Sequence, residues 1–147
     1  MSAISITIKD KRFVVGSNIV RDCNKLKTGV IRLETSFQYP DRSYVDLFLL
    51  EETLLEQPFI NSANINKTKL ILTDLGNTTN SLLDSHIELW ATQQARKMVK
   101  LVCDSLAVDY ENGEFRVFID EQGGNDLTEY VLRLAQACIR ACYINVV

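Results

Sequence analysis

Hydrophobic side chains alternate with polar ones through much of the first half of the chain. The alternation predicts β-strands over residues 3–9 and 29–37. Further strands are predicted over residues 43–50 and, as a short apolar run, over residues 69–73. One face of strand 29–37 is apolar and the other is mostly polar, so its register places one face on a core and the other in water. Residues 29–50 are therefore predicted to form a hairpin, and strand 69–73 to complete a three-stranded antiparallel unit.

Two segments of this half have no hydrophobic pattern that predicts a single type of secondary structure. The residues after the first strand fit either a strand around Phe13–Val15 or a short helix over Asn18–Leu26. Residues 51–68 show no clear period and contain Pro58. A stretch of this length without its own pattern is commonly a functional loop, so we expect a long loop here that is able to bind a partner.

The hydrophobic period changes in the second half. Apolar residues spaced three and four apart predict helices over residues 78–89 and 91–106. The Asn112-Gly113 pair lies between two alternating runs, which is a strong signal for a β-hairpin over residues 108–119.

The last element is a predicted helix that ends near Tyr143. It is preceded by Asp126, and Glu129 follows three residues later, a spacing that resembles a capping box. The order of strands, helices, hairpin and helix predicts an α+β fold: an antiparallel sheet with helices packed on one face, closed by a C-terminal hairpin plus helix.

Composition is ordinary for a globular protein. The chain has 147 residues, of which 46% are hydrophobic and 24% charged, so we expect a single domain over residues 1–147. There is no apolar run long enough to span a membrane, and the N-terminus lacks the pattern of a signal peptide. The four cysteines form no C-x-x-C pair. They are predicted to be reduced thiols, and the protein cytoplasmic.

Charge narrows the class of partner. The net charge is −3 and the pI is about 5.2, which argues against direct binding of nucleic acid. Residues 9–32 nevertheless carry seven basic and two acidic groups, whereas residues 34–56 carry six acidic groups and one basic group. Such poles either form a solvated surface or favour a charged partner.

Catalytic motifs are not apparent. His86 is the single histidine, so a metal site built on a histidine pair is excluded. A zinc site from His86 with Cys103, Cys138 and Cys142 has suitable ligand types but no recognised spacing. We expect no catalytic residue, no metal and no cofactor.

Two carboxylates define the alternative of a metal-dependent nuclease. Asp46 lies within a predicted strand and Asp74 ends the next one, so the two could approach each other. The structural interpretation is stronger: Asp46 points to solvent, and Asp74 accepts backbone N–H groups in a turn. Thr73, Asp74 and Gly76 are then a structural turn, in which Gly76 takes a conformation that other residues resist.

Predicted binding surfaces lie in the loop over residues 51–68 and at the C-terminus. The candidate partner-binding residues of the loop are Glu51, Glu52, Glu56 and Phe59. Its acids suit a basic partner, such as a nucleic-acid-binding protein, although its apolar residues could equally pin the loop to the core. Residues 138–147 are apolar on more than one face, which predicts a homodimer.

The chain resembles the bacterial and phage family called domain of unknown function eighteen twenty-eight. The strand pair over residues 35–37 and 41–49 fits the family pattern, and the most specific match is Leu-Thr-Asp-Leu-Gly-Asn-Thr over residues 72–78. The hairpin over residues 106–108 and 114–117 fits as well. The resemblance covers residues 29–120 well, and it implies a fold and a phage or mobile-element setting but no activity.

The sequence therefore favours a non-enzymatic protein-binding domain. The resemblance implies an inhibitor or adaptor from a phage or mobile element that acts on a host or defence protein, an anti-CRISPR-like inhibitor being one form. The alternatives are a carrier of polypeptide similar to type III secretion chaperones, by analogy of element order, and the metal-dependent nuclease.

Overall fold

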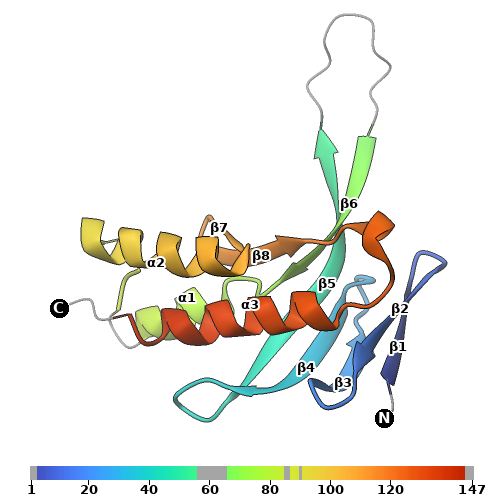
Figure 1. The fold of residues 1–147 in the computed structure, drawn as a ribbon, viewed down its shortest axis with the longest axis horizontal. Helices are drawn as coiled ribbons and strands as arrows, with labels where there is room; N and C mark the ends of the chain where they lie inside the picture. Colours follow the sequence, from blue (N-terminus) through green and yellow to red (C-terminus); the bar gives the residue numbers. More distant parts are fainter. Residues whose placement is uncertain (1–2, 56–65, 85–86, 90, 145–147) are drawn as a thin grey trace, which may run out of the picture.

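The computed structural model describes residues 3–55, 66–84, 87–89 and 91–144 (Figure 1). The strands are β1 (Ala3–Ile8), β2 (Lys11–Gly16), β3 (Val20–Lys25), β4 (Ile31–Gln38), β5 (Tyr44–Leu55), β6 (Asn66–Thr73), β7 (Asp109–Glu111) and β8 (Glu114–Phe118). The helices are α1 (Asn77–Asp84), α2 (Gln93–Leu106), the short 3-10 helix η1 (Glu121–Gly123) and α3 (Thr128–Ala141).

Six strands form one antiparallel sheet in the order β3-β4-β5-β6-β8-β7. Strands β1 and β2 pair separately as a two-stranded sheet. Helix α3 crosses the large sheet, where it packs on β8, β5, β6 and β4, and α2 packs beside α3 (Figure 1). The expected α+β architecture, with the C-terminal helix following a hairpin, is confirmed.

The core lies between the sheet and α3. Alternation along β5 directs Val45, Leu47 and Leu49 into this layer, where each is fully buried. Helix α3 contributes side chains at helical spacing, including Val131 and Leu134, which are fully buried as well. Burial of one sheet face against one helix face is the main favourable term that holds these elements together.

The two-stranded N-terminal sheet is fixed to the start of α3. Val14 in β2 accepts a hydrogen bond from the Leu127 N–H at 2.8 Å, and the Val14 N–H donates to the Asn125 carbonyl at 2.9 Å. The Gly16 N–H donates to the Thr128 hydroxyl at 3.0 Å. These bonds join residues far apart in the sequence and so anchor the first strands of the chain to its last helix.

The expected loop over residues 51–68 is wrong at both ends. Strand β5 continues to Leu55 and β6 begins at Asn66, with paired register from Phe48↔Thr73 to Leu55↔Asn66. Backbone pairing needs no alternation of hydrophobic residues, because a strand alternates only where one face is buried. Residues 51–55 and 66–68 therefore form an extended two-stranded ribbon although their sequence shows no hydrophobic period. The three-stranded unit that the sequence predicts is part of a sheet of six strands.

Three other elements, β3, α1 and the start of α3, differ from what the sequence predicts. Val20–Lys25 is a strand, so the alternative of a helix over Asn18–Leu26 is wrong. The predicted helix over residues 78–89 is shorter, because α1 ends at Asp84. The capping box fails as well. The residue that caps α3 is Leu127, without a side-chain bond, while the Asp126 carboxylate accepts the Thr128 N–H at 2.9 Å.

The end of α2 yields a test of local strain. Ala107 lies just past the helix in the left-handed region, with φ 54° and ψ 47°, and donates its N–H to the Cys103 carbonyl. This conformation costs a non-glycine residue roughly 1–2 kcal/mol, while glycine carries an entropic cost of about 0.5–1 kcal/mol. We expect Ala107→Gly to raise the free energy of unfolding in urea by about 0.5 kcal/mol. The control Ala95→Gly, inside α2, should lower it by about 1 kcal/mol or more; a loss of stability in both variants would contradict the assignment.

Candidate functional site

Asp74 follows directly after β6 and is fully buried. Its Oδ1 accepts the N–H of Gly76 at 2.8 Å and that of Phe115 at 3.0 Å, and its Oδ2 accepts the Thr78 N–H at 3.2 Å. The Gly76 donor lies in the turn before α1, the Thr78 donor in the first turn of α1, and the Phe115 donor in β8. The turn bonds that the sequence predicts are therefore present, and a bond to the neighbouring strand accompanies them.

Helix α3 also reaches this carboxylate. The Cys138 thiol donates to Asp74 Oδ2 at 3.8 Å. Burial raises the pKa of Asp74, while the three N–H donors act in the opposite direction. Burial and the nearby Asp74 charge raise the pKa of the Cys138 thiol well above its usual value, so the sulfur is protonated and serves as a donor.

Hydroxyl groups extend the cluster around Asp74. The Thr73 hydroxyl donates to the Glu114 carboxylate and accepts the Leu75 N–H, the latter at 3.0 Å. Thr78 shares a hydrogen bond of 2.7 Å with the hydroxyl of Tyr39, a residue just beyond β4. The cluster therefore connects the end of β6 and the start of α1 with β8, α3 and the turn after β4.

Two left-handed turns face each other beside this cluster. Leu75 and Gly76 have φ values of 54° and 79°, and Asn112 and Gly113 have φ values of 54° and 80°. A Cβ on Gly76 would lie 3.5 Å from the Gly113 carbonyl oxygen. The positive φ of Gly76 is the conformation predicted from the sequence, and it is one that glycine adopts at little cost.

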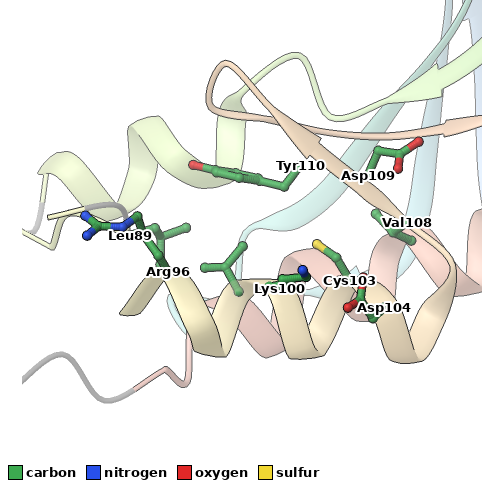
Figure 2. A pocket seen from close by; sticks show the side chains of 9 residues that line it. Leu89, Arg96, Lys100, Cys103, Asp104, Val108, Asp109 and Tyr110 are labelled. Carbon is green, nitrogen blue, oxygen red and sulfur yellow. The ribbon is translucent and has the colours of Figure 1, made fainter. Parts of the chain in front are cut away.

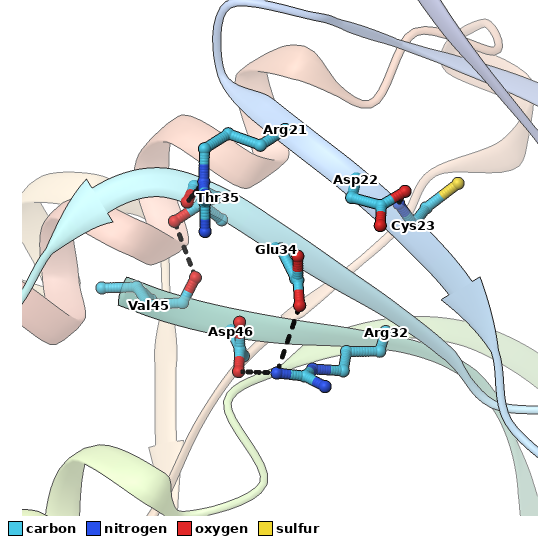
Figure 3. A network of polar contacts seen from close by, with 8 residues as sticks. All are labelled: Arg21, Asp22, Cys23, Arg32, Glu34, Thr35, Val45 and Asp46. Carbon is cyan, nitrogen blue, oxygen red and sulfur yellow. Dashed lines mark hydrogen bonds and ion pairs between the residues drawn. The ribbon is translucent and has the colours of Figure 1, made fainter. Parts of the chain in front are cut away.

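The second carboxylate of the nuclease alternative is not brought to Asp74. Asp46 lies beside Arg32 (Figure 3). The Arg32 guanidinium is 2.8 Å from Asp46 Oδ2 and 3.4 Å from the Glu34 carboxylate. The hydrogen bond that Arg32 donates to the Asp46 carboxylate raises the pKa of Arg32. Since its neighbours Val45 and Leu47 face α3, Asp46 lies on the opposite side of the sheet. Asp46 is therefore on the face away from the core, as expected, but it is partly buried there and paired with Arg32.

The candidate partner-binding acids are also paired. Glu51 and Glu52 lie in β5 and not in a loop, and as successive strand residues they face opposite sides of the ribbon. Glu51 forms an ion pair with Lys9, and Glu52 pairs with the Arg116 guanidinium at 2.7 Å. Each acid therefore has a neighbouring cation that offsets its charge. Glu56 and Phe59 lie outside the residues that the structure describes.

A cavity of about 410 Å³ lies between α2 and β7 (Figure 2). Its apolar lining includes Leu89, Val99 and Val108, and the ring of Tyr110 forms part of its β7 side. The volume falls in the range of ordinary ligand sites. Sequence analysis missed this cavity, although the order of charges along α2 was a signal that could have pointed to it.

The charged groups of this cavity lie in a definite order along α2. Arg96 and Lys100 come first, one helical turn apart, and Asp104 comes one turn later. Asp109 in β7 lines the cavity as well. The site therefore has a basic part toward the start of α2 and an acidic part toward its end (Figure 2).

A second cavity, of about 530 Å³, lies over the two left-handed turns. Leu75, Gly76 and Gly113 line it, and Tyr110 lines both cavities. The Tyr110 hydroxyl lies 3.0 Å from the Thr79 hydroxyl, and this bond fixes the ring between the two sites. Leu75 is 46% exposed despite its apolar side chain.

Within the described ranges, the His, Cys, Asp and Glu side chains form no group of three or more placed to hold a metal ion. His86, the candidate zinc ligand, lies outside those ranges. None of the α-helices in the described part of the chain has the length and hydrophobicity that a membrane-spanning helix requires.

The three N–H bonds to Asp74 predict a large cost of truncation. Asp74→Ala leaves the buried Thr78 and Phe115 donors without an acceptor, and each unsatisfied group costs about 1–3 kcal/mol. We expect a loss of about 2–4 kcal/mol in the free energy of unfolding measured in urea. Asp74→Asn retains one acceptor oxygen and should lose less.

The exposed Asp84, at the end of α1, provides the matched control. Asp84→Ala should change the free energy of unfolding by less than about 0.5 kcal/mol. If Asp74→Ala matched this control in stability yet lost a metal-dependent activity, the structural assignment of Asp74 would be replaced by the nuclease alternative.

Comparisons with known proteins agree with the resemblance seen in the sequence. Residues 59–141, more than half of the chain, match the family described as domain of unknown function DUF1828. The match includes the C-terminal helix α3, but not the strand pair over residues 35–49. The comparison with curated proteins gives no match, and neither does that with solved structures. With the Asp74 turn, both cavities and α3 inside the matched region, the chain belongs to the DUF1828 family.

Proposed function

We propose that this chain is a non-enzymatic protein-binding domain that uses the β5–β6 ribbon as its principal contact with a partner. The observation that carries the proposal is the length of this ribbon beyond the sheet (Figure 1). A binding element that projects from a rigid scaffold is a common arrangement for recognition.

The ribbon leaves the sheet at a defined point. The pairing of β4 with β5 reaches Leu49, and the pairing of β8 with β6 reaches Ile71. Beyond these residues, β5 and β6 remain paired in register up to Leu55↔Asn66. A two-stranded ribbon is marginally stable on its own, and its outer edges carry backbone groups that a partner strand can pair with. Contact with a partner is therefore a reason for the ribbon to extend so far.

The proposed partner is a protein, and a basic nucleic-acid-binding protein fits the acidic balance of the chain, with its pI of about 5.2. Because Glu51 and Glu52 are paired with Lys9 and Arg116, their acidity alone does not select this partner. The family resemblance supports a cytoplasmic inhibitor or adaptor from a phage or mobile element as the setting.

The geometry supports binding over nuclease chemistry. Both Asp74 oxygens are occupied by N–H donors, and Asp46 is held by Arg32 on the other side of the sheet. A two-carboxylate centre would need these groups on one side and open to a metal.

We further propose that the chain forms a homodimer, although the apolar surplus at the C-terminus is smaller than the sequence suggested. Cys138, Ala141 and Ile144 are buried in the core, whereas Tyr143 is 71% exposed. Leu101 on α2 is 65% exposed and adds a second apolar residue available to an interface.

Light scattering at micromolar concentration tests the dimer. We expect twice the chain mass of 16.7 kDa for the natural sequence, and a shift toward the monomer for Tyr143→Glu, because a charge buried at an interface is costly. Lys25→Glu, a control at an exposed position of the edge strand β3, should leave the mass unchanged. A monomer for the natural sequence at all concentrations would rule out the dimer.

The ribbon can be shortened without touching the core. Thr53 and Thr68 lie opposite each other, so an Asn-Gly turn that joins them removes residues 54–67 and preserves β5 and β6 up to that pair. We expect the free energy of unfolding of this variant to lie within about 1 kcal/mol of that of the natural chain. We also expect the variant not to capture the partner that the natural chain captures from a bacterial lysate.

The control for this experiment is Asp84→Ala, which lies on α1 and away from the ribbon. It should capture the partner as the natural chain does. If the shortened variant is folded and still captures the same partner with unchanged affinity, the ribbon is not the principal contact and the proposal is wrong.

A further inference from the structure

The cavity between α2 and β7 has a charge order that is unfavourable for its own helix. Arg96 lies in the first turn region of α2, and Asp104 lies in its last turn. The helix dipole favours the opposite arrangement, with acids near the N-terminus and bases near the C-terminus, by typically about 0.3–1 kcal/mol for each charge. Both charged residues line the same cavity.

Residues that act against local stability are commonly found where a protein binds or reacts. From the charge order of this cavity, the α2–β7 cleft, we propose that it binds an extended peptide segment of a partner protein. An acidic side chain of the segment lies over Arg96 and Lys100, and a basic one lies beside Asp104. An apolar side chain of the same segment lies between them.

The middle of the cleft suits an apolar side chain. Val99 and Val108 line the cavity, and each is only 5% exposed. Their side chains are therefore packed in place and form an apolar wall of the cavity. Burial raises the pKa of the Cys103 thiol to about 11, so at neutral pH this residue is a small, uncharged part of the lining. Tyr110, held by its bond to Thr79, forms the facing wall (Figure 2).

The spacing of the charges sets the form of the segment. Arg96 and Asp104 are eight residues apart, which is about 12 Å along a helix. In an extended chain, side chains at i, i+2 and i+4 share one face, and the first and last are about 13–14 Å apart. An acid-x-apolar-x-base segment therefore matches both the order and the length of the cleft.

This inference rests on the proposed protein-binding function and assigns it a second, separate contact. The ribbon extends from β5 and β6 (Figure 1). Residues of α2 and β7 line the cleft, and β7 is an edge strand of the sheet. The cleft lies wholly inside the region that matches the family, while β5 lies outside it.

Two synthetic peptides of the same composition test the cleft. The first, acetyl-Thr-Glu-Thr-Leu-Thr-Lys-Thr-amide, has the proposed spacing. The second, acetyl-Thr-Thr-Leu-Glu-Lys-Thr-Thr-amide, places the charges side by side. In a titration followed by amide nuclear magnetic resonance, we expect the first peptide to shift resonances of α2 and β7 and to bind at least about threefold more tightly than the second.

Variants of α2 make the test specific. Asp104→Lys should weaken binding of the first peptide by about three- to tenfold, because it replaces the proposed partner of the basic side chain with a like charge. Ser105→Lys adds a base at the adjacent exposed position, which does not line the cavity. It should leave the affinity unchanged.

The inference is overturned if the two peptides bind equally, if the first causes no shifts in α2 and β7 at millimolar concentration, or if Asp104→Lys leaves the affinity for the first peptide unchanged. When the peptide fails but capture of the partner still depends on the ribbon, the cleft is rejected and the proposed function stands. When the peptide binds but shortening the ribbon does not affect capture, the proposed role of the ribbon is the part that fails.

Discussion

One buried carboxylate, that of Asp74, joins elements from the middle and the end of the chain. Asp74 accepts the N–H groups of Gly76, Thr78 and Phe115 and a bond from the Cys138 thiol. A buried charge is tolerated only when hydrogen bonds replace its hydration. Because the donors come from α1, β8 and α3, the carboxylate requires all of these elements to be in place together, and this dependence fixes where the helices meet the sheet.

The proposed function places two distinct surfaces on the scaffold that Asp74 holds together. The bond network around Asp74 holds the hairpin that carries Tyr110, and Tyr110 separates the two neighbouring cavities. The ribbon extends from the centre of the same sheet, where pairing beyond Leu49 and Ile71 is between β5 and β6 themselves. A scaffold fixed by internal hydrogen bonds can carry surfaces whose residues serve recognition and not packing.

Local patterns in the sequence predicted the elements that depend on neighbouring residues. The Asn112-Gly113 hairpin, helix α2 and the turn at Gly76 follow from nearby side chains and were predicted correctly. Long-range partners were not predictable in this way. The periodic pattern of the sequence does not show that Phe115, which is 41 residues from Asp74, is its hydrogen-bond partner. It also does not show that Arg32 pairs with Asp46. The ribbon was missed because pairing of backbone groups does not depend on hydrophobic alternation.

Native-state hydrogen exchange at two amides tests the central role of Asp74 most directly. The N–H groups of Thr78 and Phe115 belong to different elements but share one acceptor carboxylate. If the carboxylate holds both elements as one unit, the two amides open together, and their opening free energies should agree within about 0.7 kcal/mol, a factor of three. Thr78 exchanging through a local opening at least 1.4 kcal/mol below that of Phe115, a factor of about ten, would contradict the account.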